Sequence, residues 1–288
     1  MADGSVAFVE IERGTVSRAA PDGTVSVIAQ VGGGPNGLAV GPDGAFYLCN
    51  NGGFLWREAA GRLHVVRGTP PHYAGGSIQR VDPVSGAVRT LYERCGDVRL
   101  CGPNDLVFDD QGGFYFTDFG KSRPRDRDIG CVYYALPDGS SITELVHPIM
   151  APNGIGLSPD GRTLYVAETD TARLWAFDVV APGVLGPAMS AAPHGGRLVC
   201  GLAGYQRLDS LALEASGNIC VATLVTGEVT VIAPSGEVLR RHRFADADTT
   251  SLCFGGAGLR TAYVTQSGEG SLLQLPWPEA GLALAFNA

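Results

Sequence analysis

Two short apolar runs joined by a glycine turn recur along the chain. In residues 101–120, CGPNDLVFDDQGGFYFTDFG, a Pro-Asn pair opens the first run, and a turn at Gly112 leads into the second. Alternating apolar runs of this length, bounded by turn residues, predict paired antiparallel β-strands. Related stretches begin at Pro35, Pro152, Leu208 and Thr249.

The spacing inside these stretches is constant. A polar residue opens each first strand, and a turn glycine follows it eight positions later, as Asn104 and Gly112 show (112 − 104 = 8). A third and often a fourth strand-like run follows each pair, for example GCVYYAL and ITELVHP. Each repeat therefore predicts a four-stranded antiparallel meander.

The number of repeats decides the fold class. Residues 3–29 supply one further repeat that begins partway through, and 288/6 = 48 residues per repeat is the length of a propeller blade. We predict an all-β fold, a six-bladed β-propeller of four-stranded blades forming a single domain over residues 1–288. The first blade is expected to be incomplete at its N-terminal side, and GLALAFNA at 281–288 is expected to be an outer strand. A pair of β-sandwiches is the alternative, which six repeats in one register disfavour.

Composition narrows the function classes. The net charge is −8 and no dense Lys/Arg run occurs, which disfavours nucleic acid or an anionic membrane as the main partner. No apolar stretch approaches the roughly 18 residues of a membrane span, and the start lacks the layout of a signal peptide. Seven scattered cysteines indicate reduced thiols, although Cys95 and Cys101 are near enough in sequence to pair. We expect a cytoplasmic protein, a monomer or weak homodimer.

The first strand of a propeller blade lies innermost, so the residues that open these strands should form a ring at one end of the central channel. Amide and carboxylate oxygens gathered there suit a hard divalent cation, with Ca²⁺ as the first expectation and Zn²⁺, Mn²⁺ or Mg²⁺ as alternatives. The other interpretation is that these residues only cap the entry turns, which Asn and Asp do well. The residues are Asn36, Asn104, Asn153, Asp209 and Thr250.

The sequence resembles the senescence-marker-protein/gluconolactonase/LRE family of six-bladed propellers along essentially the whole chain. The stretches that carry the resemblance are PNDLVFD, PNGIGLSPDGRTLYVAET and LDSLALEASGNICVA. The resemblance implies hydrolysis of lactones, or of organophosphates in some relatives. It implies that Asn153 and Asp209 hold a divalent metal, and that Asn104 contacts the metal, its water or the substrate. It also implies a ligand Glu from the first blade, which by the repeat spacing would fall before Met1 (4 − 8 = −4).

The chemistry of these residues agrees with that implication. A divalent cation polarises a lactone carbonyl, and Asp209 is the ring member able to accept a proton from the attacking water. Direct nucleophilic attack by Asp209 is the mechanistic alternative. A non-catalytic propeller and a cyclase of the same fold remain as other function classes. The substrate is a small lactone or ester, and the substrate-binding residues expected are Asn36, Asn104, Tyr73 and Asp118.

Two long connections should lie at the same end of the propeller as the ring. Residues 51–78 carry Tyr73, and residues 119–130 carry Lys121, and we expect both to form a lid that shapes substrate choice. The basic run GKSRPRDRDIG alternates with Asp and predicts a solvated loop. The residues that end the second strands are secondary candidates, with turn formation as their simpler role: Asn50, Asp118, Glu168 and Gln266.

Overall fold

The computed structural model describes residues 1, 3–59 and 61–286, and its regular structure is almost entirely β-strand. The chain divides into two compact units. Unit 1 comprises Met1–Arg57, Val65–Val146 and Leu284–Ala288, and unit 2 comprises Glu58–His64 and His147–Ala283. Each unit is built from the antiparallel sheets of three repeats.

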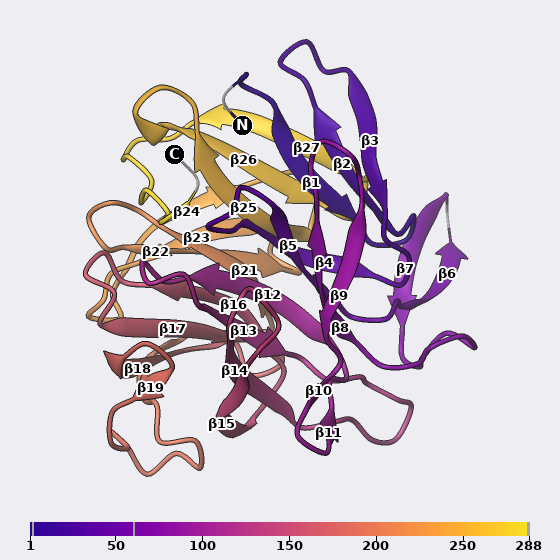
Figure 1. Ribbon diagram of the computed structural model, residues 1–288. Coiled ribbons are helices and arrows are strands. Elements are labelled where there is room, and N and C mark those ends of the chain that lie inside the picture. Colours follow the sequence, from indigo (N-terminus) through magenta and orange to yellow (C-terminus); the bar gives the residue numbers. More distant parts are fainter. Residues whose placement is uncertain (2, 60, 287–288) are drawn as a thin grey trace. The chain divides into compact units, whose positions relative to one another are not determined.

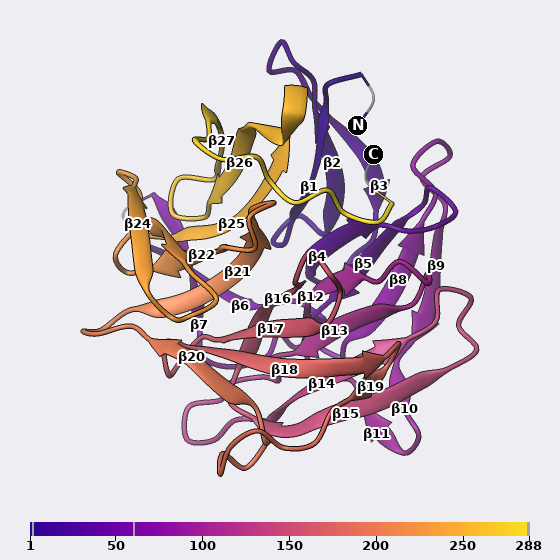
Figure 2. The ribbon, with the colours of Figure 1, turned by 90° about the vertical axis from the view of Figure 1, so that its left-hand side faces the viewer.

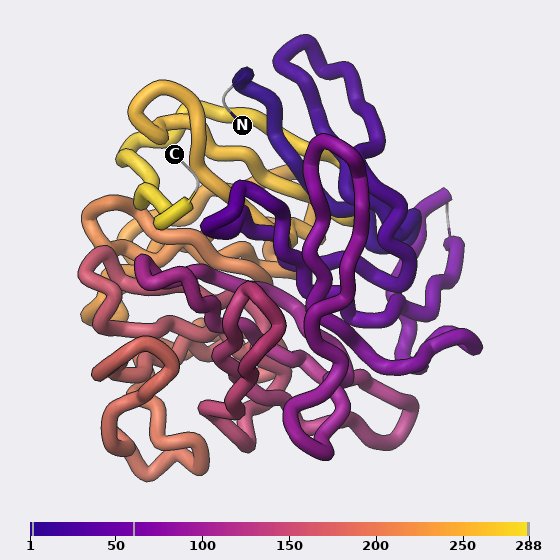
Figure 3. Tube along the Cα trace, viewed as in Figure 1, coloured from indigo at the N-terminus to yellow at the C-terminus, as the bar shows by residue number. Residues whose placement is uncertain are grey.

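The sheets of the first three repeats have the orders β1-β2-β3, β4-β5-β8-β9 and β12-β13-β14-β15. Their strands are labelled in Figure 1, and Figure 3 traces the path of the chain through them. The hairpin β6-β7 lies within the second repeat, between β5 and β8, and the hairpin β10-β11 follows that repeat, between β9 and β12. The bounds are β1 (Val6–Glu10), β2 (Thr15–Ala19), β3 (Val25–Gln30), β4 (Pro35–Val40), β5 (Phe46–Asn50), β6 (Leu55–Ala59), β7 (Arg62–Val66), β8 (Ser77–Val81), β9 (Val88–Tyr92), β10 (Arg94–Cys95), β11 (Val98–Arg99), β12 (Pro103–Phe108), β13 (Phe114–Asp118), β14 (Gly130–Ala135) and β15 (Ile142–Ile149).

The last three repeats form the sheets β16-β17-β18-β20, with β19 paired to β18, then β21-β22-β23-β24, then β25-β26-β27 (Figure 2). A short 3₁₀ turn, η1 (Ala257–Leu259), joins β25 to β26. The bounds are β16 (Pro152–Leu157), β17 (Thr163–Glu168), β18 (Arg173–Ala181), β19 (Val184–Leu185), β20 (Arg197–Gly201), β21 (Arg207–Leu213), β22 (Ile219–Leu224), β23 (Glu228–Ile232), β24 (Val238–Arg243), β25 (Thr249–Gly255), β26 (Thr261–Gln266) and β27 (Ser271–Pro276).

Neighbouring sheets within a unit pack face to face. The second strands β5 and β13 are buried on both faces, as their apolar sequences FYLCN and FYFTD require. Between them Tyr47, Phe108 and Phe114 form an aromatic cluster with ring centroids 5.1 to 6.0 Å apart. In unit 2 a corresponding core joins Leu174 of β18 to Leu211 of β21. Burial of apolar side chains between neighbouring sheets therefore stabilises each unit.

The predicted fold class, an all-β six-bladed β-propeller, is confirmed. The expectation of four strands in every blade is wrong in detail, because the first and the last sheets have three strands each in the described part of the chain. A three-stranded sheet is thus not peculiar to the N-terminal repeat.

The expected outer strand at 281–288 is not formed. Gly281 makes one isolated bridge with Glu214, residues 282–286 are not strand, and residues 287 and 288 lie outside the described residues. Leu282 packs against the apolar core of unit 2 instead of pairing with β27. Apolar residues of this segment serve as a core filler, which their alternation alone does not distinguish from a strand.

All seven cysteines are free, so Cys95 and Cys101 do not pair. Among the described residues, no helix is long and apolar enough to span a membrane.

One buried carboxylate organises the end of β21 in unit 2. The Glu214 side chain is fully buried, and it accepts hydrogen bonds from Trp277 Nε1 and Asn218 Nδ2, both at 2.8 Å, and from Arg240 Nη2. These contacts tie β21 and β24 to the residue that follows β27. A buried carboxylate with three donors is stabilising only as a complete set, because each donor left behind is desolvated without a partner.

We predict that Glu214→Ala lowers the free energy of unfolding by about 3 kcal/mol, since it strands a buried indole N–H and a guanidinium. Urea unfolding followed by circular dichroism measures this change. The control is Glu237→Ala, an exposed position on the turn before β24, which should shift stability by less than about 0.5 kcal/mol. Equal effects of the two variants would contradict the role given to Glu214.

Candidate functional site

Each residue predicted to open an inner strand lies at a β-bulge. In the third sheet the pairing is regular from Phe108↔Phe114 to Leu106↔Phe116 and then shifts, so that Pro103 pairs with Asp118. The same shift occurs at the start of β4, β16, β21 and β25. A bulge leaves its residues out of the regular alternation and redirects their side chains. The bulged positions include Asn36, Asn104, Asn153, Asp209 and Thr250.

Glycines after two of these residues let neighbouring bulges approach closely. A Cβ atom at Gly37 would lie 2.7 Å from the Asn104 carbonyl oxygen, and one at Gly154 would lie 2.7 Å from the Asp209 carbonyl oxygen. Any larger residue would push the strands apart. The structure therefore brings Asn36 beside Asn104 in unit 1 and Asn153 beside Asp209 in unit 2.

Asn104 has the environment expected of a ligand. Its side chain is 6% exposed, and Oδ1 is buried with no hydrogen-bond partner among the described residues. A buried acceptor without a partner costs free energy, so such an atom calls for a bound donor or cation. This observation fits Asn104 as an oxygen ligand of a divalent cation.

The other predicted ligands differ in burial. Asn153 is buried, and its Nδ2 donates to Thr169 Oγ1 at 3.1 Å, which fixes the orientation of the amide. Asp209 and Asn36 are partly exposed. Within residues 1, 3–59 and 61–286 no group of three or more His, Cys, Asp or Glu side chains could hold a metal ion. The predicted ligand set contains one carboxylate and two amides, so it is not a group of that kind.

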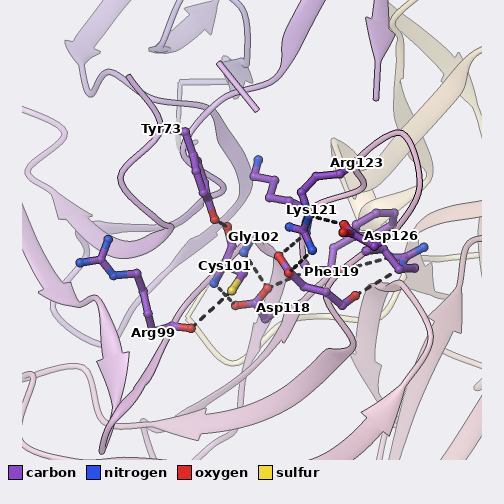
Figure 4. A network of polar contacts seen from close by, with 12 residues as sticks. Tyr73, Arg99, Cys101, Gly102, Asp118, Phe119, Lys121, Arg123 and Asp126 are labelled. Carbon is purple, nitrogen blue, oxygen red and sulfur yellow. Dashed lines mark hydrogen bonds and ion pairs between the residues drawn. The ribbon is translucent and has the colours of Figure 1, made fainter. Parts of the chain in front are cut away.

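The residues that end the second strands hold the entrance to the inner strands. Asp118 accepts hydrogen bonds from the backbone N–H groups of Cys101 (2.7 Å), Gly102 (2.6 Å) and Gly120 (2.9 Å), as Figure 4 shows in part. Asn50 Oδ1 accepts from Gly34 N at 2.8 Å in the same way. Glu168 in unit 2 accepts from Met150 N at 2.8 Å. Turn formation, the simpler of the two roles considered from the sequence, is what these contacts show.

Asp118 was predicted to bind substrate, but both of its oxygens already carry backbone hydrogen bonds. The side chain is 4% exposed, and burial raises the pKa of its carboxyl above the ordinary value, with the three amide donors opposing that rise. Its contacts position the segment that leads into Asn104. The sequence could not show this, because the same Asp-Phe-Gly pattern suits an exposed turn.

Tyr73 lies where the first long connection meets the second. Its hydroxyl donates to the Cys101 carbonyl at 2.6 Å, and its ring lies 5.3 Å from Lys121 Nζ. Backbone N–H of Gly68 also donates to the Ser122 carbonyl at 2.8 Å. The parts of the two connections in unit 1 are thus in contact with each other (Figure 4). Residue 60, in the predicted lid, lies outside the described residues.

The prediction of a solvated basic loop at 120–130 is wrong for Lys121, which is 3% exposed. Lys121 Nζ donates to Asn51 Oδ1 at 3.1 Å and to the Gly53 carbonyl at 2.7 Å. Charge alternation in the sequence correctly describes Arg123, which forms ion pairs with Asp126 and Asp128, but it does not reveal that the first basic residue of the run is buried.

Comparisons with known proteins agree with this architecture. The family model described as SMP-30/Gluconolactonase/LRE-like region matches residues 1–268. The chain is 32% identical to lactonase drp35 of Staphylococcus saprophyticus over 214 residues, which is 73% of this chain and 57% of that protein. It is 37% identical to lactonase drp35 of Staphylococcus epidermidis over 145 residues, 49% of this chain and 42% of that protein. The match thus spans about half the length of these relatives.

Solved structures show the same fold. A gluconolactonase from Xanthomonas campestris superimposes with a TM-score of 0.74 at 24% identity, covering 96% of this chain and 83% of that one. Regucalcin from Agrobacterium tumefaciens, a calcium-binding protein, superimposes with a TM-score of 0.74 at 18% identity, covering 98% and 88%. With a family model matched over residues 1–268, the chain belongs to the SMP-30/gluconolactonase/LRE-like family.

Proposed function

We propose that this protein hydrolyses lactones with the help of a divalent cation. The observation that carries the proposal is the buried Asn104 Oδ1, an acceptor that has no partner within the described residues. Two further facts support it: relatives at 32% and 37% identity are named lactonases, and a structure of the same fold is a gluconolactonase.

The residues proposed to hold the cation are Asn104, Asn153 and Asp209. When bound, a divalent cation supplies a Lewis acid that polarises the lactone carbonyl and stabilises the negative charge that develops on its oxygen. The two amide ligands donate oxygen lone pairs without cancelling the charge of the cation. Oxygen-only ligands favour Ca²⁺ first, with Zn²⁺, Mn²⁺ and Mg²⁺ as alternatives, and the calcium-binding relative supports that order.

Asp209 is proposed as the general base. Its carboxylate is partly exposed, so water can reach it, and it is the one member of the predicted ligand set that can accept a proton. It would take the proton of the attacking water as the new carbon–oxygen bond forms. It would return this proton to the ring oxygen as the carbon–oxygen bond of the ring breaks, so that the ring oxygen leaves as the alcohol of the hydroxy acid. Asn36 and Tyr73 are proposed to contact the substrate, while Asp118 acts by positioning the segment that carries Asn104.

We predict that Asp209→Asn reduces kcat for lactone hydrolysis by roughly 10²-fold to 10⁴-fold, because the amide cannot accept a proton. A pH-stat assay on γ- and δ-lactones, aldonolactones and a phosphotriester measures the rates. Asp178→Asn, an exposed change on β18, serves as the control and should keep the wild-type rate. Wild-type turnover by Asp209→Asn would exclude Asp209 as the base, and faster phosphotriester than lactone hydrolysis would replace the proposed substrate class.

We predict that Asn104→Leu weakens divalent metal binding by about tenfold or more, since an oxygen ligand is lost. Calorimetric titration of Ca²⁺ and Zn²⁺ into chelator-treated protein measures the affinity. Without metal the same variant should be at least as stable to heat as the wild type, because it removes a buried acceptor that lacks a partner. Unchanged affinity would show that Asn104 is not a ligand.

A further inference from the structure

Lys121 is the only lysine in a chain whose other 20 basic residues are arginines, counted from the 21 Lys and Arg residues of the sequence. It is also 3% exposed. Lysine is almost never fully buried in proteins, because removing an ammonium from water is costly. A position that only required charge at the surface would be served by arginine, as it is everywhere else here.

The surroundings of the ammonium are made of neutral groups. Nζ donates to Asn51 Oδ1 and to the Gly53 carbonyl, and it lies 4.8 Å from the centre of the Phe54 ring and 5.3 Å from that of Tyr73. Two hydrogen bonds and two aromatic faces offset part of the desolvation cost. Phe54 in turn packs edge-on against Trp56 at 5.8 Å. These contacts link several residues of segment 51–57 to the ammonium.

The titratable groups nearest to Lys121 are occupied elsewhere. Asp118 is bound by three backbone amides, and Asp128 pairs with Arg123 and accepts from the backbone N–H of Lys121. Both carboxylates attract the ammonium through space, as would the Cys101 thiolate, but burial of the amine outweighs them and lowers the pKa of Lys121 from 10.5 to about 8. Tyr73 is not ionised near neutrality, since burial raises the pKa of its hydroxyl.

Lys121 joins two segments that start at the same end of adjacent sheets. Segment 51–57 follows Asn50, which pairs with Pro35 at the start of β4. The turn at 119–128 follows Asp118, which pairs with Pro103 at the start of β12. The two segments thus leave the sheets beside Asn36 and Asn104. One side chain of the turn, Lys121, reaches into the other segment through its hydrogen bonds to Asn51 and Gly53.

We propose that Lys121 is a positioning residue that fastens segment 51–57 to the turn at 119–128, and that the fastened pair determines which substrates reach Asn36 and Asn104. The part concerning substrates rests on the proposed function, whereas the fastening does not. A compact ammonium with three N–H donors reaches both oxygens between two rings, which the larger planar guanidinium of arginine would not fit equally well. Methionine would match the volume but would leave the Gly53 carbonyl without its donor.

Hydrogen exchange in the wild type and in Lys121→Met tests the fastening. Protection of amides in 51–57 and 119–128 should fall on the order of tenfold in the variant, because opening of these segments no longer breaks the two hydrogen bonds. Arg125→Met is the matched control: it removes one positive charge from the same turn at an exposed residue and should leave protection unchanged. Unchanged protection in Lys121→Met, or an equal loss in Arg125→Met, would overturn the proposal.

Kinetics test the second half. Lys121→Met should raise KM several-fold with kcat changed less than about twofold, which is the pattern of altered access rather than lost chemistry. A fall in kcat with unchanged exchange would mean that Lys121 touches the substrate, contrary to the proposal. If the wild type hydrolyses no lactone, the proposed function fails while the exchange result still decides the fastening. Should Lys121→Met not fold, Asn51→Ala removes one acceptor of the same contact and is measured instead.

The single lysine permits a direct measurement of its ionisation. In protein labelled with ¹³C at lysine Cε, the one resonance should titrate with a midpoint near 8 rather than 10.5. Between these values the unfolded chain keeps a proton that the folded chain has released, so stability relative to Lys121→Met should rise with pH across that window. A midpoint near 10.5 together with unchanged hydrogen exchange in Lys121→Met would overturn the fastened arrangement.

Discussion

At the entrance to three inner strands, β4, β12 and β16, a buried polar side chain accepts hydrogen bonds from backbone N–H groups. Asp118 does this with three amides, and Asn50 and Glu168 do it at the corresponding places of the neighbouring repeats. Buried amides need acceptors, and these side chains supply them where no strand can. Because the entering segment is fixed, the next residues start the inner strand in a bulge of defined geometry, and the candidate ligands are carried by that bulge.

The bulge explains why amides rather than more carboxylates open the inner strands. Adjacent bulges approach to contact distance at Gly37 and at Gly154, so the side chains beside them are crowded. Two carboxylates there would repel each other unless a cation were always bound, whereas Asn104 and Asn153 carry no charge. Neutral amide oxygens destabilise the metal-free folded state less than carboxylates would, and they would leave the proposed cation a strong Lewis acid. Asn104 Oδ1, which is buried without a hydrogen-bond partner in the part of the chain that the structure describes, destabilises that arrangement.

In the connection after β13, the buried and the exposed charged groups have different partners. Lys121 donates hydrogen bonds to neutral oxygens of another segment, while Arg123 forms ion pairs with Asp126 and Asp128. The buried ammonium of Lys121 therefore takes no part in the ion pairs that Arg123 forms in the same turn. The starts of β4 and β12 and the connections that follow β5 and β13 lie at the same end of their sheets. Binding residues commonly lie on connections held by a rigid scaffold.

The sequence alone was sufficient to predict the six repeats and, in five of them, the residue that opens the inner strand. These features are local, because strand alternation and turn glycines act over a few residues. In each copy of the pattern the turn glycine follows the opening residue by eight positions, as Gly112 follows Asn104. The apolar residues near 281–288 misled the prediction, because alternation indicates burial without saying whether the partner is a strand or a core.

The tertiary structure decided what local pattern cannot encode. Whether Asp118 meets solvent or three amides depends on the path of residues 101–120, and whether Lys121 is solvated depends on residues about 70 positions away. Both residues lie in a turn-like stretch of sequence, Asp118 before Phe119 and Gly120 and Lys121 after them. The packing of the folded chain, which buries both side chains, determines their roles. Burial changes the energetics of a charged group more than any neighbour in sequence does, and burial is a property of the folded chain.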